Sequence, residues 1–153
     1  MDRQDDGVAW HILNNIGENF GVSIINEGYE LINNTSAKLS IFYSLQLLPE
    51  MAEFINQYDT VYFVDAHTGE YEEEILYSEI HPQALNSPFT HHLTPEMLLS
   101  ICLTIFNNYP RSYILSVKGH EFGFNHDLSN LTQALAEQAS AILINKILQV
   151  NID

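Results

Sequence analysis

The residues of this chain with the clearest chemical potential are carboxylates and histidines spread over three separate segments. Asp5 and Asp6 open a predicted helix, Asp65 ends an apolar run, and the pair His91 and His92 precedes another predicted helix. Carboxylate oxygens and imidazole nitrogens together suit a divalent ion, and three such ligands leave coordination positions open. Each residue also has a structural explanation, as a helix cap, a turn cap or a surface side chain. The residues alone leave both interpretations open.

Several other kinds of site are poorly supported. The chain has no G-x-S-x-G, G-x-G-x-x-G, Walker or H-E-x-x-H motif. Its single cysteine, Cys102, lies in an apolar run, which excludes an intramolecular disulfide and favours a buried apolar role. His120 and Glu121 are adjacent on an extended segment, and neighbouring residues of a strand point to opposite faces. This pair is therefore a poor candidate for holding one ion.

The elements that must position these residues alternate between helix and strand. We expect helices over about 6–20, 49–58 and 94–108 and a last long helix capped by Ser129, with strands over 39–47, 60–66, 75–80 and 112–118. Thr94 and Pro95 form a strong helix start, because threonine caps the free N–H groups and proline needs none. The last helix is expected to bury a stripe of Leu131, Leu135, Ala139 and Ile142.

Strands separated by helices predict one α/β domain over residues 1–153. We expect a three-layer sandwich, in which helices cover both faces of a mostly parallel, twisted sheet. Function in such sheets gathers at the carboxyl ends of the strands, which is where Asp65 lies. A helix that begins at residue 6 leaves no room for a preceding strand, so the N-terminal strand of this sheet is expected to be missing or truncated.

The bulk composition limits the partners of the chain. Its 153 residues are 46% hydrophobic and 16% charged, which is typical of a globular domain. The net charge of −15 excludes a phosphate-backbone binder, so no nucleic acid is expected, and it favours a basic or metal-bearing partner. No apolar run approaches a membrane span, and a single free cysteine fits a reducing compartment. We expect a cytoplasmic protein without a membrane partner.

Five segments together resemble one known family. They are Arg3–Ala9 (RQDDGVA), Gln46–Glu50 (QLLPE), Asp59–Ala66 (DTVYFVDA), Thr90–Leu99 (THHLTPEMLL), and the pair formed by 117–119 and 128–129. Their order and spacing resemble those of the hydrogenase maturation endopeptidases, which process the large subunit of nickel–iron hydrogenases. The resemblance extends over nearly the whole chain, although no single segment is specific.

The resemblance implies a function and a set of site residues. Members of this family remove a C-terminal extension from the hydrogenase large-subunit precursor after nickel has been inserted. The positions that recognise the nickel correspond to Asp6, Asp65 and His91 in this chain. The nickel would arrive with the precursor, and the isolated protein could hold another divalent ion. The implied partner is the precursor, and the protein itself is expected to be a monomer.

One departure from the family leaves alternatives open. The family begins with an apolar strand and a G-x-G-N turn, and this chain begins just after that point. Either the first strand is absent or Met1 is an internal methionine of a longer reading frame. A rival interpretation is therefore a non-catalytic homologue that binds the large subunit without cutting it. A metal hydrolase with an unrelated substrate is a more distant alternative.

Overall fold

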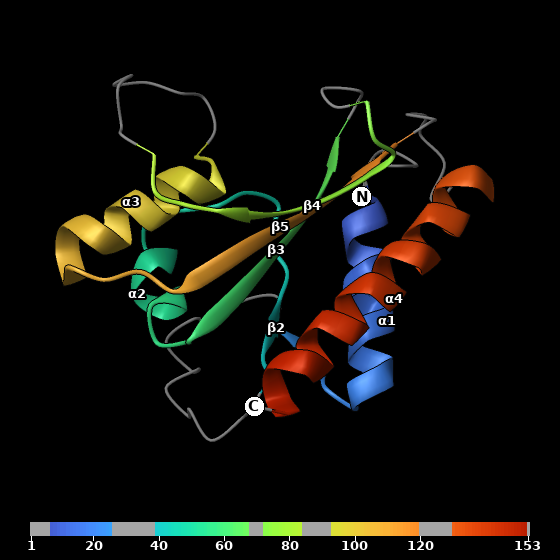
Figure 1. The fold of residues 1–153 in the computed structure, drawn as a ribbon, viewed down its shortest axis with the longest axis horizontal. Helices are drawn as coiled ribbons and strands as arrows, with labels where there is room; N and C mark the ends of the chain where they lie inside the picture. The colour runs from blue at the N-terminus through green and yellow to red at the C-terminus, as the bar shows by residue number, and fades with distance from the viewer. Residues whose placement is uncertain (1–6, 26–38, 68–71, 84–92, 120–129, 153) are drawn as a thin grey trace. The chain divides into compact units, whose positions relative to one another are not determined.

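The chain folds into alternating helices and strands. A computed structural model describes residues 7–25, 39–67, 72–83, 93–119 and 130–152. In chain order the elements are α1 (Val8–Phe20), β1 (Ile24–Ile25), β2 (Ile41–Phe42), α2 (Met51–Ile55), β3 (Thr60–His67), β4 (Ile75–Ile80), α3 (Pro95–Phe106), β5 (Arg111–Lys118) and α4 (Asn130–Ile152) (Figure 1). This order confirms the predicted α/β class. The expectation of a missing first strand concerns residues ahead of Gly7, which lie outside the described ones.

The larger of the two described sheets has three strands in the order β3-β5-β4. The Arg111 N–H donates to the Asp59 carbonyl at 3.1 Å, and the Gly119 N–H donates to the His67 carbonyl at 2.9 Å. The first bond joins the start of β5 to the start of β3, and the second joins the end of β5 to the end of β3. The two strands are therefore parallel. The Lys118 N–H donates to the Glu74 carbonyl at 2.7 Å, which makes β4 antiparallel to β5. The sheet is therefore mixed.

The chain divides into two compact units. Unit 1 comprises Met1–Ile24, Val64–Tyr77 and Ile114–Asp153, and unit 2 comprises Ile25–Phe63 and Ser78–Tyr113. Each strand of the three-stranded sheet contributes residues to both units. No helix among the described residues combines the length and the apolar character needed to cross a membrane.

Unit 1 is built on the packing of α1 against α4. From α1, Val8, Ile12 and Ile16 are buried at helical spacing. On α4 the buried positions include the small residues Ala136, Ala139 and Ser140, and small side chains let a helix pack closely against its neighbours. The Asn15 amide donates to the Ser140 hydroxyl at 3.1 Å, and this hydroxyl donates to the Ala136 carbonyl at 2.7 Å. The polar atoms at this helix contact are therefore hydrogen-bonded.

Unit 2 is built on the packing of α2 against α3. The buried side chains are Met51, Ala52 and Ile55 on α2 and Leu98, Leu99 and Cys102 on α3. The Thr94 hydroxyl caps α3 by accepting the Met97 N–H at 3.2 Å, with Pro95 in the first turn, as the sequence predicts. The Tyr62 and Tyr113 rings stack across β3 and β5 with centroids 5.6 Å apart.

Two local predictions were wrong. The strand expected over 39–47 is only Ile41–Phe42, because the Ser44 hydroxyl donates to the Gln46 carbonyl and accepts the Gln46 N–H, forming a local turn. On α4, Leu135 and Ala139 are buried as expected, but Leu131 is 49% exposed and Ile142 is only partly buried. The buried stripe instead includes Thr132, Ser140 and Leu143. Residue 129, the expected cap of this helix, lies outside the described residues.

Candidate functional site

Asp65 lies near the carboxyl end of β3, the position that the sequence predicts for function. The strand preceding it is rich in branched and aromatic residues, and it is held to β5 at both ends by backbone hydrogen bonds. The Asp65 side chain is exposed, and its Oδ1 accepts the N–H of Ala66 at 2.8 Å. This bond orients the carboxylate on a fixed strand end while leaving the residue open to solvent. Such a group can meet a positive charge carried by another molecule.

His67, the last residue of β3, was missed by the sequence analysis. It follows Asp65 by two residues, so the two side chains leave the strand on the same face. It is only 3% exposed, and its carbonyl accepts the Gly119 N–H from the end of β5. The period of two along the strand was the signal that could have drawn attention to it.

The other two predicted site residues, Asp6 and His91, each precede a helix in the sequence. Asp6 immediately precedes Gly7, which is buried, and α1 begins one residue later at Val8. His91 precedes the Thr94 cap of α3 by three residues. Both Asp6 and His91 lie outside the described residues. Within residues 7–25, 39–67, 72–83, 93–119 and 130–152, no three His, Cys, Asp or Glu side chains could hold a metal ion together. The three-residue site therefore stays a prediction.

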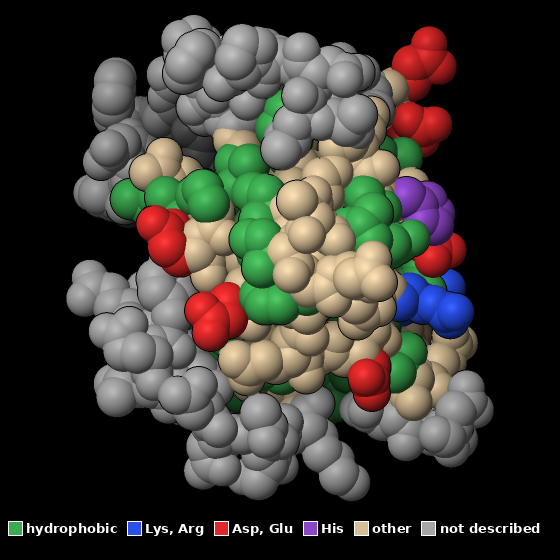
Figure 2. Space-filling model, turned by 90° about the vertical axis from the view of Figure 1, so that its left-hand side faces the viewer, with side chains coloured by type: hydrophobic (Ala, Val, Ile, Leu, Met, Phe, Trp, Pro, Cys, Tyr) green, Lys and Arg blue, Asp and Glu red, His purple; other side chains and the backbone are tan. Residues whose placement is uncertain are grey.

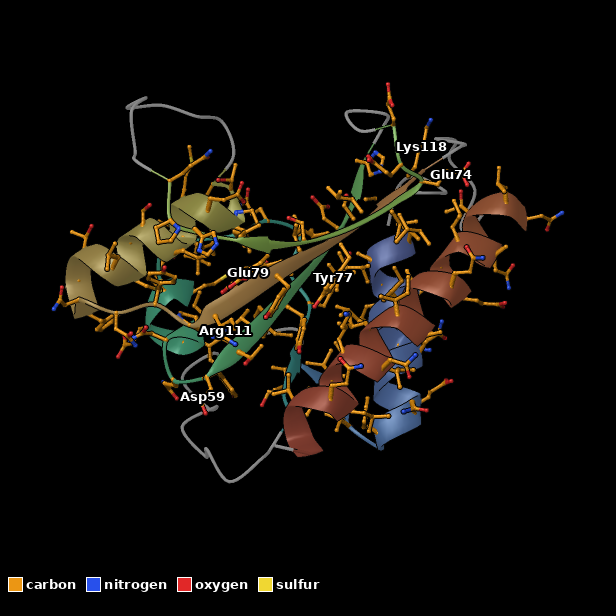
Figure 3. The ribbon with its side chains drawn as sticks, in the orientation of Figure 1. Asp59, Glu74, Tyr77, Glu79, Arg111 and Lys118 are labelled. Atoms are coloured by element: carbon orange, nitrogen blue, oxygen red, sulfur yellow. The ribbon has the colours of Figure 1, made fainter. Side chains whose placement is uncertain are left out.

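Charged side chains are distributed along the three-stranded sheet (Figure 3). In unit 2, Asp59, Glu79 and Arg111 come from the region of β3, from β4 and from β5. In unit 1, Glu74 directly precedes β4 and Lys118 ends β5, and the Lys146 ammonium lies 5.2 Å from the centre of the Tyr77 ring. The contact between Lys146 of α4 and Tyr77 of β4 is of a kind that stabilises structure, and it involves neither Asp65 nor β3.

Cys102 has the surroundings of a structural residue. It is fully buried in the middle of α3, and its Sγ lies 3.4 Å from the Ala52 carbonyl oxygen. Burial raises the pKa of the Cys102 thiol, because the charged thiolate loses its hydration. A protonated, inaccessible thiol cannot act as a nucleophile. The apolar role that the sequence predicts for this residue is confirmed.

A shallow hollow in unit 1 is lined by residues other than Asp65. Its walls are the C-terminal half of α1 and the residues that follow it: Trp10, Asn14, Gly17, Glu18, Gly21, Val22, Ser23 and Ile24. Glu18 is the only ionisable group in this wall, and Asn14 donates a hydrogen bond to it at 3.3 Å. The hollow therefore offers no pair of groups for acid–base or metal chemistry.

Comparison with known proteins gives no match to a family model and no match to a curated protein sequence. Four solved structures are similar in fold, and three of them illustrate the similarity. The hydrogenase maturating endopeptidase HybD from E. coli is 12% identical with a TM-score of 0.67, covering 97% of this chain and 87% of that one. The [NiFe] hydrogenase maturation proteases HycI and HybD from Thermococcus kodakarensis are 17% and 10% identical, each with a TM-score of 0.60.

These two archaeal structures cover 97% and 95% of this chain, and 86% and 91% of their own chains. The similarity thus extends over almost all of the sequence rather than over one α/β motif within it. The chain has the fold of the hydrogenase maturation proteases.

Proposed function

We propose that this protein is an endopeptidase that removes the C-terminal extension from a nickel–iron hydrogenase large-subunit precursor after nickel insertion. The observation that carries the proposal is the fold, which matches hydrogenase maturation proteases over at least 95% of the chain. The resemblance of the segments around Asp6, Asp65 and His91 to that family supports it independently. In this proposal the protein acts in the cytoplasm as a monomer.

The proposed substrate carries its own metal, and Asp65 suits the recognition of such a metal. Its carboxylate is exposed at a strand end and is oriented by the Ala66 N–H. Two carboxylates and an imidazole, from Asp6, Asp65 and His91, are a mixed oxygen and nitrogen set that divalent nickel accepts. The same set could hold another divalent ion in the isolated protein. Orientation of a ligand by a neighbouring backbone group is a common feature of metal recognition.

The chemistry required is hydrolysis of one peptide bond. A bound divalent ion can position the scissile peptide, or polarise its carbonyl and activate a water molecule. Cys102, the only cysteine of the chain, is buried with a raised thiol pKa, so it does not offer a covalent route. We therefore propose hydrolysis at the metal-recognising residues rather than at a side-chain nucleophile.

Replacing Asp65 tests this proposal directly. Purified protein is incubated with the nickel-loaded precursor, and the intact mass of the precursor is followed over time. We expect loss of a C-terminal peptide with the parent protein and a rate roughly 100-fold lower with Asp65→Asn, because the amide neither carries the charge nor binds metal as well. Glu137→Gln removes an exposed acid of α4 and is the matched control, expected to cut at the parent rate.

Three results would contradict parts of this assignment. Normal cleavage by Asp65→Asn would exclude Asp65 from the site. A precursor that binds the parent protein but keeps its full mass would favour the non-catalytic homologue. A precursor that neither binds nor changes mass would reject the proposed substrate altogether.

A further inference from the structure

Helix α3 is apolar on almost every side. Nine of its twelve residues are apolar: Pro95, Met97, Leu98, Leu99, Ile101, Cys102, Leu103, Ile105 and Phe106. A helix of this composition is normally buried all round. One face of α3 is buried, with Leu98, Leu99 and Cys102 at 0% exposure and α2 packed against it. The apolar residues beyond that face need a separate explanation.

The last turn of α3 is left open to solvent. Leu103 is 42% exposed, Ile105 65% and Phe106 39%, and we refer to these three residues as the α3 end patch. The helix stops directly after them, because Asn107 adopts a left-handed conformation with φ of 55° and its N–H bonds to the Leu103 carbonyl at 3.0 Å. In Figure 2, hydrophobic side chains reach the surface between acidic ones on the side of the molecule where α3 is drawn in Figure 1.

The charge of unit 2, which contains the α3 end patch, selects among the possible partners. The described residues of unit 2 carry the acids Glu50, Glu53, Asp59, Glu79 and Glu96 against the single cation Arg111. Glu53 is exposed on α2 next to Ala52, whose carbonyl contacts Cys102, the residue before Leu103. An exposed apolar patch on an acidic unit complements an apolar surface that is bordered by basic side chains. A second copy of this chain, with its own net charge of −15, would be repelled.

We propose that the α3 end patch docks a partner protein through an apolar surface that is bordered by lysine or arginine side chains. This inference rests on the proposed function, under which the partner is the body of the large-subunit precursor. His91, a proposed nickel-recognising residue, lies four residues before the start of α3 in the sequence. Twelve residues of α-helix span about 18 Å. The α3 end patch therefore lies at the opposite end of the helix from Pro95, its first residue.

The small size of the α3 end patch fits a transient contact. Three side chains form the centre of an interface rather than a large obligate surface. A processing enzyme must release its product, so a weak anchor that adds electrostatic attraction suits repeated turnover. The excess of acids in unit 2 adds specificity, since a partner with an acidic border would be repelled.

The test compares precursor binding by two matched variants, both carrying Asp65→Asn so that cleavage is slow on the timescale of the binding measurement. Ile105→Lys places a positive charge in the α3 end patch, and Val150→Lys does the same at a residue of α4 that is 46% exposed. Binding of the nickel-loaded precursor, and of the same protein without its C-terminal extension, is measured by biolayer interferometry. We expect Ile105→Lys to weaken both by about tenfold or more and Val150→Lys by less than about twofold. Glu53→Gln should weaken binding at low salt and have little effect at high salt.

The outcomes separate the docking surface from the proposed function. Suppose that the protein carrying Asp65→Asn alone binds the precursor and that adding Ile105→Lys leaves this binding unchanged. The docking surface is then wrong, and the proposed function stands. If both the parent and its Asp65→Asn variant bind no precursor, the proposed function fails and the docking inference fails with it. Sedimentation that shows a dimer of the parent, dissociated by Ile105→Lys, would assign this face to a second copy and overturn the inference. Circular dichroism verifies the fold of each variant, and Ile105→Ser replaces any variant that misfolds.

Discussion

At the scale of single residues, burial separates side chains that the sequence presents as equally reactive. Asp65 is exposed at the end of β3, where its carboxylate can meet another molecule. Cys102 is at 0% exposure in α3, and burial holds its thiol protonated. The difference follows from position: Asp65 lies two residues before the end of β3, whereas Cys102 continues the buried stripe of Leu98 and Leu99.

The buried thiol predicts slow reaction with a thiol reagent. Burial raises the pKa of the Cys102 thiol above its value in the unfolded chain. The thiol therefore stabilises the folded state below the unfolded pKa, and this stabilisation is lost as the pH rises through the folded pKa. At mildly alkaline pH the native protein should react with Ellman's reagent roughly 100-fold more slowly than the urea-unfolded chain, because reaction requires opening of α3. Fast, stoichiometric reaction of the native protein would show that Cys102 is accessible. Cys102→Ala supplies the baseline.

The candidate site could be predicted from sequence only in part. The apolar run of 60–66 was enough to place Asp65 at a strand end, because the run and its acid lie next to each other in the chain. His67 escaped notice because only the alternation of a strand reveals that it shares the face of Asp65. Asp6 and His91 are far apart in the sequence, and nothing local specifies whether they meet. Their joint role stays a prediction that the Asp65→Asn experiment begins to test.

At the scale of elements, boundaries were predicted correctly where the local sequence signal was strong. They were predicted wrongly where another local interaction competed with that signal. Strand β4 spans the predicted 75–80, and α3 begins at its predicted threonine cap. Strand β2 is shorter than its apolar run because Ser44 forms a turn with Gln46. The stripe of α4 was misplaced because α4 has apolar residues on several sides, while its buried face includes polar Thr132 and Ser140. Hydrogen bonding to Asn15 and to the Ala136 carbonyl makes burial of Ser140 acceptable.

The close contact between α1 and α4 predicts that a larger side chain at Ala139 destabilises the protein. Ala139 is fully buried on α4, so Ala139→Leu must displace the atoms packed against it, at a cost of about 1–3 kcal/mol. Ala141→Leu adds the same atoms on the exposed side of α4 and should change stability by less than about 0.5 kcal/mol. Urea unfolding followed by circular dichroism measures both. Equal midpoints for the two variants would mean that the contact is not tightly packed.

At the scale of the whole molecule, charge is the dominant property. Five lysines and arginines oppose twenty aspartates and glutamates, and the acids include the exposed run Glu72, Glu73 and Glu74. Like charges held within a compact fold repel each other, and this repulsion is relieved when the chain unfolds. The same excess of acid that would attract a basic partner thus lowers the stability of the isolated protein at low ionic strength.

This repulsion predicts that salt stabilises the protein. Raising NaCl from about 10 mM to about 150 mM shortens the screening length from about 30 Å to about 8 Å, which weakens repulsion between acids on different elements. The melting temperature should therefore rise by several degrees. Glu73→Lys changes the net charge from −15 to −13, since one negative charge is lost and one positive charge is gained. This variant should melt higher than the parent at low salt and gain less from added salt. A melting temperature of the parent that falls with salt would mean that attractive ion pairs outweigh the repulsion. The surface acids would then be paired within the protein rather than available to bind a basic partner.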